Sequence, residues 1–103
     1  MGDIFKINEN YKAILKLEEI LTQKNIPHDL IKMFDGWGIF YPDREAPIFD
    51  VIEHLYSYGS EKDLLEAMGE GIIEVEGFLS VEEALKFFEI VHENTMKEKD
   101  NGN

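Results

Sequence analysis

The sequence predicts a single α+β domain, built as a three-stranded antiparallel meander with helices packed on one face and one helix near each end. Apolar residues recur with helical spacing near both ends, and the segment between them carries turn signals flanked by aromatic and β-branched runs. The length of 103 residues suits one domain. We expect the domain to cover residues 1–96 and residues 97–103 to form a polar, frayed tail.

The first helix is expected over residues 10–24. Its apolar positions follow the i, i+3, i+7 spacing of an amphipathic helix: Tyr11, Ile14, Leu17 and Leu21. Asn8 or Asn10 can cap its first turn, because a short side-chain oxygen accepts hydrogen bonds from the free N–H groups there. Pro27 prevents the helix from continuing and so places its end before that residue.

A β-hairpin is expected next, around the pair Asp35-Gly36. This pair lies between two apolar and aromatic runs, and it favours a type I′ turn, in which both central residues have positive φ. The flanking strands are expected near residues 28–34 and 37–41.

Residues 48–56, IFDVIEHLY, fit either a helix or a strand. Ile48, Val51 and Leu55 have helical spacing, whereas the enrichment in β-branched and aromatic residues is typical of a strand. A hairpin alone is marginal in water, so a third strand has a physical reason to form. We therefore favour a strand that completes the meander.

A short helix is expected from Ser60 to Met68. Ser60 and Asp63 have the spacing of a capping box, in which each side chain satisfies a backbone N–H of the other residue. Gly69 is expected to close this helix. Residues 72–79 then form a short strand or an extended connector.

The last helix is expected from Ser80 to about Met96. Ser80 and Glu83 have the spacing of a second capping box. The apolar residues after it fall on one side of a helix: Val81, Ala84, Leu85, Phe88 and Val91.

These segments together resemble a family of small proteins from phages and prophages of Firmicutes. The resemblance rests on YKAILKLEEIL, IPH, DGW, VIEH followed by SYG, DLLEAMG, and the V-x-G-x-L-[ST]-x-E-E start of the last helix. It covers roughly residues 11–90, and residues 69–76 differ from it. It implies a phage accessory protein, and short proteins of that kind often bind host factors, including defence systems. It brings no catalytic signature to this chain.

The charge is acidic and unevenly distributed. Residues 45–96 hold thirteen acidic residues against two basic ones, Lys62 and Lys86, in a chain of formal net charge −12. A field of that sign repels phosphate and anionic lipid, which disfavours direct binding of nucleic acid or membrane. A simple solubility role accounts for the same charge. Because there is no cysteine, no long apolar run and no signal-peptide pattern, we expect a cytosolic protein.

No constellation of residues predicts catalysis or metal binding. The histidines, His28, His54 and His92, are separated in sequence, and Asp50 would join His54 at a metal only if their segment were helical. Gly69-Glu70-Gly71 follows a predicted helix, whereas a phosphate-binding loop precedes one. We expect a non-enzymatic protein without metal or cofactor.

One candidate binding surface is aromatic. Trp and Tyr are enriched at interfaces because each combines a large apolar area with a polar tip. The set consists of Trp37, Tyr41, His54 and Tyr58. The same residues can instead form the core face of the meander, since aromatic residues favour strands.

The other candidate surface is an acidic stripe on the last helix. Glu82, Glu89 and Glu93 are spaced by seven and four residues, which aligns them along one side of a helix. Carboxylates one turn apart approximate the spacing of DNA phosphates, so the stripe can compete for a basic groove. A solvated helix face has the same pattern.

Two functions therefore compete. The first is a phage-type accessory protein that binds and modulates a basic host protein, either a nucleic-acid-handling or a defence factor, as an anti-defence inhibitor would. The second is a protein that sequesters a small nucleotide signal in a pocket lined by the aromatic set. The lack of a basic cluster to neutralise phosphates favours the first. The sequence leaves the oligomeric state open.

Overall fold

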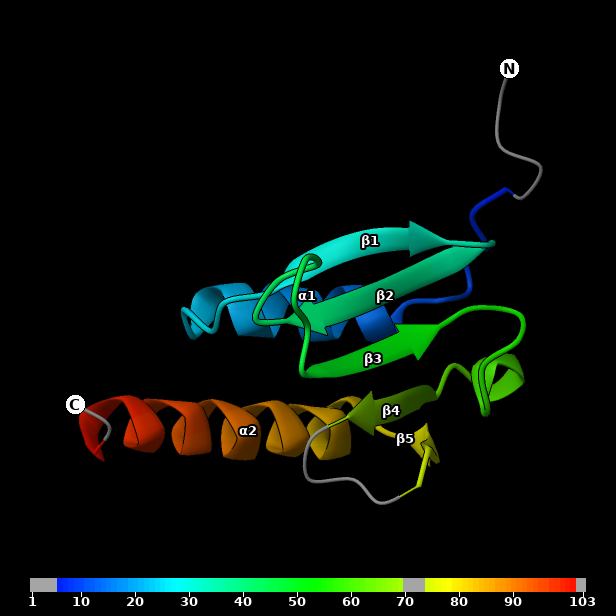
Figure 1. Ribbon diagram of the computed structural model, residues 1–103. Helices are drawn as coiled ribbons and strands as arrows, with labels where there is room; N and C mark the ends of the chain where they lie inside the picture. Colours follow the sequence, from blue (N-terminus) through cyan, green and yellow to red (C-terminus); the bar gives the residue numbers. More distant parts are fainter. Residues whose placement is uncertain (1–5, 70–73, 102–103) are drawn as a thin grey trace.

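The computed structural model describes residues 6–69 and 74–101 and contains a sheet with two long helices (Figure 1). The elements follow the chain in this order: α1 (Ala13–Gln23), β1 (Asp29–Met33), β2 (Gly36–Tyr41), β3 (Phe49–Glu53), the 3₁₀ turn η1 (Ser60–Lys62), β4 (Leu65–Gly69), β5 (Glu76–Leu79) and α2 (Val81–Asn101). None of the described helices combines the length and the apolar character that crossing a membrane requires.

The five strands form one antiparallel sheet in the order of the chain, β1-β2-β3-β4-β5. This confirms the α+β class, and the sheet has two strands more than the predicted three. Residues 48–56 contribute the strand β3, as favoured above. Within the expected connector 72–79, β5 occupies the last four residues, while residues 72 and 73 lie outside the described part of the chain.

The predicted helix from Ser60 to Met68 is wrong. Only a single 3₁₀ turn forms, and it ends at Lys62, because the next residue, Asp63, has a φ of 56° that is incompatible with a continuing right-handed helix. Leu65 and Ala67 then alternate into the core as part of β4, where both are fully buried. Pairing with β3 therefore overrides the helix propensity of this segment.

Both helices pack on the same face of the sheet, which is where the core lies (Figure 1). In each strand, alternate side chains point towards the helices. The buried core draws on both helices and on four strands: Ala13, Ile14, Leu17, Leu21, Ala84, Phe88, Val91, Ile39, Tyr41, Phe49, Val51, Leu65, Ala67 and Leu79. Among the described residues, no helix packs on the opposite face of the sheet.

The hairpin between β1 and β2 forms, but its turn lies one residue earlier than predicted. Met33 pairs with Gly36, so the central residues are Phe34 and Asp35, and Phe34 has the positive φ of 55°. Gly36 is required for a different reason. A Cβ atom on Gly36 would lie 1.9 Å from the backbone oxygen of Glu53 in β3.

The helix termini show one prediction confirmed and one wrong. The box of Ser80 and Glu83 forms: Ser80 N–H donates to Glu83 Oε1 at 2.9 Å and Glu83 N–H to Ser80 Oγ at 3.2 Å. That hydrogen bonding lowers the pKa of Glu83.

The predicted caps of α1, Asn8 and Asn10, do not cap this helix. Instead, Asp63 Oδ1 accepts hydrogen bonds from the N–H groups of Lys12 and Ala13. Glu53 Oε1 accepts a hydrogen bond from the N–H group of Ile14. The helix α2 continues past Met96 to Asn101.

Candidate functional site

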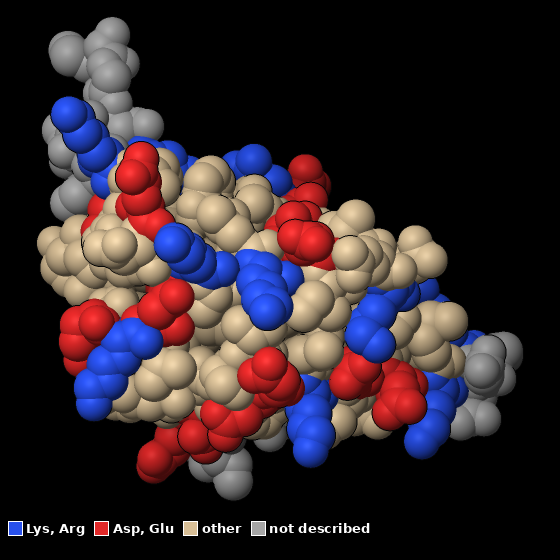
Figure 2. Space-filling view, turned by 180° about the vertical axis from the view of Figure 1, so that it is seen from behind, with Lys and Arg blue, Asp and Glu red and all other residues tan. Residues whose placement is uncertain are grey.

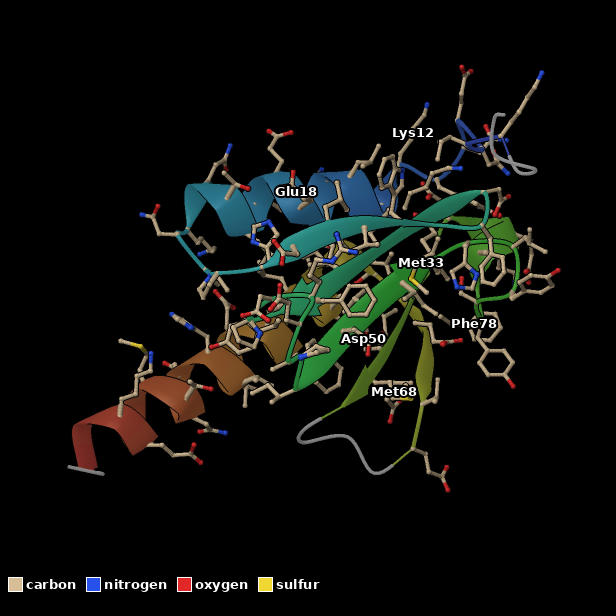
Figure 3. All side chains as sticks on the ribbon, turned by 45° about the horizontal axis from the view of Figure 1, so that its top comes forward. Lys12, Glu18, Met33, Asp50, Met68 and Phe78 are labelled. Carbon is tan, nitrogen blue, oxygen red and sulfur yellow. The ribbon has the colours of Figure 1, made fainter. Side chains whose placement is uncertain are left out.

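The face of the sheet opposite the helices is mostly apolar, and we call it the open face. It is defined by the outward side chains of the strands: Ile31, Met33, Phe40, Asp50, Ile52, Glu66, Met68 and Phe78. Figure 3 shows Met33, Asp50, Met68 and Phe78 on the side of the sheet away from α1. Met68 on β4 and Phe78 on the edge strand β5 are 51% and 52% exposed, so this side of the sheet presents large apolar side chains to solvent.

Three apolar side chains of the open face, those of Met33, Phe40 and Ile52, gather around Gly38. This glycine pairs with Ile31 on one side and Ile52 on the other. A Cβ atom placed on Gly38 would lie 2.6 Å from Met33 Sδ, 2.9 Å from Phe40 Cε2 and 3.3 Å from Ile52 Cγ2. Neighbouring side chains therefore close over the glycine and flatten the surface there.

An aromatic cluster extends this surface at the β1–β2 turn. The Phe34 ring meets those of His54 and Tyr56 edge-on, with centroids 4.9 and 4.8 Å apart. Tyr56 N–H donates to His54 Nδ1 at 3.1 Å, and burial lowers the pKa of His54, so the imidazole is neutral at pH 7. Tyr56 remains 64% exposed. The cluster is thus a fixed apolar rim with one exposed phenol.

A second rim is formed by the loop before η1 and by β5. Phe78 N–H donates to the backbone oxygen of Tyr58 at 3.3 Å, and Tyr58 N–H donates to Glu66 Oε1 at 2.9 Å. A Cβ atom on Gly77 would lie 2.4 Å from Tyr58 Cβ, so the loop packs directly on β5. Lys62 Nζ lies 6.0 Å from the Phe78 ring at this edge.

The charged groups on the outward positions of β1 to β4 are all carboxylates. Phe40 pairs with Asp29 on β1 and Asp50 on β3, which places an acid on each side of its ring. Asp29 Oδ2 accepts from the N–H of Arg44 at 2.8 Å. Burial, reinforced by the Glu66 charge, raises the pKa of Asp50 from its ordinary 3.8 to about 6.

The predicted aromatic set does not form one site. Trp37 and Tyr41 lie on the helix side of β2, and Tyr41 is only 1% exposed, with its hydroxyl 2.9 Å from His92 Nδ1. His54 belongs to the aromatic cluster at the turn, and Tyr58 to the second rim. The sheet separates the first two residues from the others, so they do not line a common pocket.

The three acidic residues of α2 lie in a mixed-charge environment. Glu82 and Glu93 are exposed, whereas Glu89 Oε2 lies 3.4 Å from Lys24 Nζ of α1. Glu89 and Glu93, but not Glu82, border a shallow groove of about 680 Å³. Its lining residues are Lys24, Ile26, Lys86, Glu89, Ile90, His92 and Glu93. Seen from behind the sheet, acidic and basic side chains are interspersed (Figure 2).

No metal centre is found in the described residues, because no three His, Asp or Glu side chains gather there. His28 is held by structural contacts: its Nδ1 lies 2.7 Å from the oxygen of Ile26 and its Nε2 3.0 Å from Glu18 Oε2. The hydrogen bond from His28 lowers the pKa of Glu18.

The fold and the open face define a class: an α+β protein in which the described helices, α1 and α2, both cover the same side of the antiparallel sheet. Comparisons of the chain with protein-family models, with curated proteins and with solved structures found no match. No relative therefore supplies site residues for this chain.

Proposed function

We propose that this chain is a non-enzymatic protein-binding protein that holds its partner on the open face. The observation that carries the proposal is the contrast between the two faces of one sheet. One face is buried by α1 and α2, while the other exposes apolar side chains such as Met68 and Phe78. Contiguous uncovered apolar surface commonly marks a binding site, because burying it against a partner is favourable.

Charge indicates which kind of partner suits this face. The strands present only carboxylates among their outward charged groups, and the whole chain has a formal net charge of −12. Phosphate backbones and anionic lipids are repelled by such a surface, whereas a basic protein surface is attracted. The resemblance to phage and prophage proteins suggests a host protein, either a nucleic-acid-handling or a defence factor, which binding would inhibit.

A second copy of this chain is a poor occupant of the same face. In a twofold dimer the same surface patch is used on both subunits. Asp50 and Glu66 of one copy would then approach the acidic face of the other copy. Like charges brought together at an interface are unfavourable, so the partner is a different, basic protein.

The test compares Met68→Lys with Ile90→Lys. Met68 lies on the open face and Ile90 on α2, and the two are nearly equally exposed, at 51% and 53%. Tagged protein captures partners from a host extract, and the captured protein is purified and its Kd measured. Met68→Lys should weaken binding at least about tenfold, because it places a buried cation against a basic partner. Ile90→Lys should change the Kd by less than about twofold.

Both variants should melt close to the parent protein, since exposed substitutions usually change stability by within about 0.5 kcal/mol. A folded Met68→Lys protein that binds the purified partner as tightly as the parent would refute the proposal. So would a loss of binding in Ile90→Lys alone, which would place the interface on α2.

A further inference from the structure

We infer that the partner presents an Arg or Lys surrounded by apolar side chains, and that this cation is received by Asp50 and Glu66 within the open face. The inference rests on the proposed function and deepens it, because it names the chemistry that the open face selects.

The two carboxylates are placed together by the register of β3 and β4. Asp50 pairs with Met68, and Glu66 is two residues from Met68 on the same strand, so Asp50 and Glu66 are diagonal neighbours. Diagonal pairs on one face of an antiparallel sheet lie about 7–8 Å apart, within reach of a single long side chain placed between them. Both residues are partly buried, and each is the second residue of its strand.

Each carboxylate is set in apolar or hydrogen-bonded surroundings. Asp50 has Phe40 and Met68 as its direct cross-strand neighbours. Glu66 is oriented by the Tyr58 N–H, which donates to its Oε1 at 2.9 Å. Glu66 is therefore oriented before a partner arrives, which lowers the entropy cost of ordering it on binding.

The folded chain leaves this pair electrostatically unfavourable. Burial and the Glu66 charge raise the pKa of Asp50, which means that its ionised form is disfavoured where it stands. Other charged groups near this face include Asp29, which accepts from Arg44 N–H, Asp35 beside the aromatic cluster, and Lys62 at the Phe78 edge. A cation from a partner would relieve the repulsion, and further burial would strengthen the pairing.

Arg suits this site better than Lys. A guanidinium has five donors in a planar fork, so it can bind two carboxylates at once, and its flat face stacks on aromatic rings. The Phe40 ring adjoins Asp50 and supplies such a surface. The apolar residues around the pair would receive the apolar side chains that flank the Arg.

The probes are three synthetic amphipathic helical peptides with one Leu-lined stripe. They differ at a single central position of the stripe, which is Arg, norleucine or Glu. Their affinities for the full chain are measured at pH 7.5 by fluorescence anisotropy. The Arg peptide should bind at least about tenfold more tightly than the norleucine peptide, and the Glu peptide most weakly.

The variant Asp50→Asn should reduce the preference for Arg over norleucine to less than about threefold, with the norleucine peptide bound about as well as before. The matched control is Glu93→Gln, which removes an exposed charge on α2 and should leave the preference unchanged. Raising the salt concentration should also reduce the preference, because added ions screen the charge pair.

The outcomes separate the inference from the function it rests on. Equal binding of the Arg and norleucine peptides overturns the inference and leaves an apolar protein-binding face intact. A preference for Arg that survives in Asp50→Asn places the cation elsewhere and also overturns it. If the parent protein binds none of the peptides, both the inference and the proposed function fail.

Discussion

Replacing Glu53 by Gln is expected to stabilise the fold by on the order of 2–3 kcal/mol at pH 7. Glu53 is the last residue of β3, and its side chain is completely buried against the first turn of α1. Its Oε1 accepts a hydrogen bond from Ile14 N–H at 3.1 Å. No N–H group of the described residues donates to its Oε2. Burial, a side-chain hydrogen bond with Asp63 and the Asp63 charge raise the pKa of Glu53 from its ordinary 4.5 to about 9.

The direction of the pH dependence follows from that pKa. Between pH 4.5 and 9, Glu53 holds a proton in the folded chain but loses it in the unfolded chain. The free energy of unfolding therefore falls as the pH rises through this window. Gln has the shape of the protonated acid, can accept a hydrogen bond from Ile14 N–H and does not ionise. The free energy of unfolding of the variant therefore does not fall through this pH window on account of residue 53.

Urea denaturation at pH 5 and pH 8 measures the effect. The gain from Glu53→Gln should be small at pH 5 and large at pH 8. Using the difference between variant and parent cancels the contributions of Asp50 and His54. Glu61→Gln is the matched control, because Glu61 is exposed, and it should show no such trend. A variant less stable than the parent at pH 8 would mean that Glu53 is ionised and stabilises the helix terminus as an anion.

Replacing Gly36 by Ala is expected to destabilise the protein by about 3 kcal/mol or more. The added Cβ atom would lie 1.9 Å from the backbone oxygen of Glu53 and 2.9 Å from the Tyr11 ring. The first of these neighbours belongs to the backbone of a paired strand, so relieving the clash requires β2 and β3 to separate. Gly36→Asn should be at least as harmful.

Two controls identify the cause. In Gly38→Ala the added Cβ atom meets side-chain atoms only, those of Met33, Phe40 and Ile52, and the change should cost less than about 1.5 kcal/mol. Asn tolerates positive φ better than Ala does. If Gly36→Asn were clearly milder than Gly36→Ala, positive φ rather than steric contact would explain the glycine. Denaturation midpoints of the three variants decide between these explanations.

The sequence indicated both long helices because their signals are local. The helical spacing of Ile14, Leu17 and Leu21 and the box of Ser80 and Glu83 act within a few residues, and both appear in the structure. The N-terminus of α1 was missed because its caps come from Glu53 and Asp63, which are distant in sequence. No pattern within one helix can reveal such partners.

The strand β4 was missed because its local preference opposes its structure. The segment EKDLLEAMG has a helix-forming composition and a plausible capping box, but Leu65 and Ala67 gain more by burial beside β3. The predicted turn was one residue too late, at Asp35-Gly36 instead of Phe34-Asp35. The prediction explained Gly36 by positive φ in a turn, whereas the structure requires a glycine there because β3 lies too close for a Cβ atom.

The candidate site was only partly visible in the sequence. The acidic character was evident from composition, but the open face depends on which side the helices cover. Trp37 and Tyr41 alternate with Phe40 along β2, so they lie on opposite faces of the strand, and the predicted aromatic set took its β2 residues from the face that the helices cover. Met68 could not be assigned to the face while its segment was interpreted as a helix.

The central claim, that the open face holds a protein partner, is tested most directly by site-specific photo-cross-linking in cells that produce the chain. A benzophenone side chain replaces Phe78 on the open face or, as the control, Leu15 on α1; these residues are 52% and 42% exposed. We expect the position 78 probe to give a cross-linked species of defined mass, and the position 15 probe to give none. A cross-link to the same partner from position 15, with none from position 78, would contradict the claim.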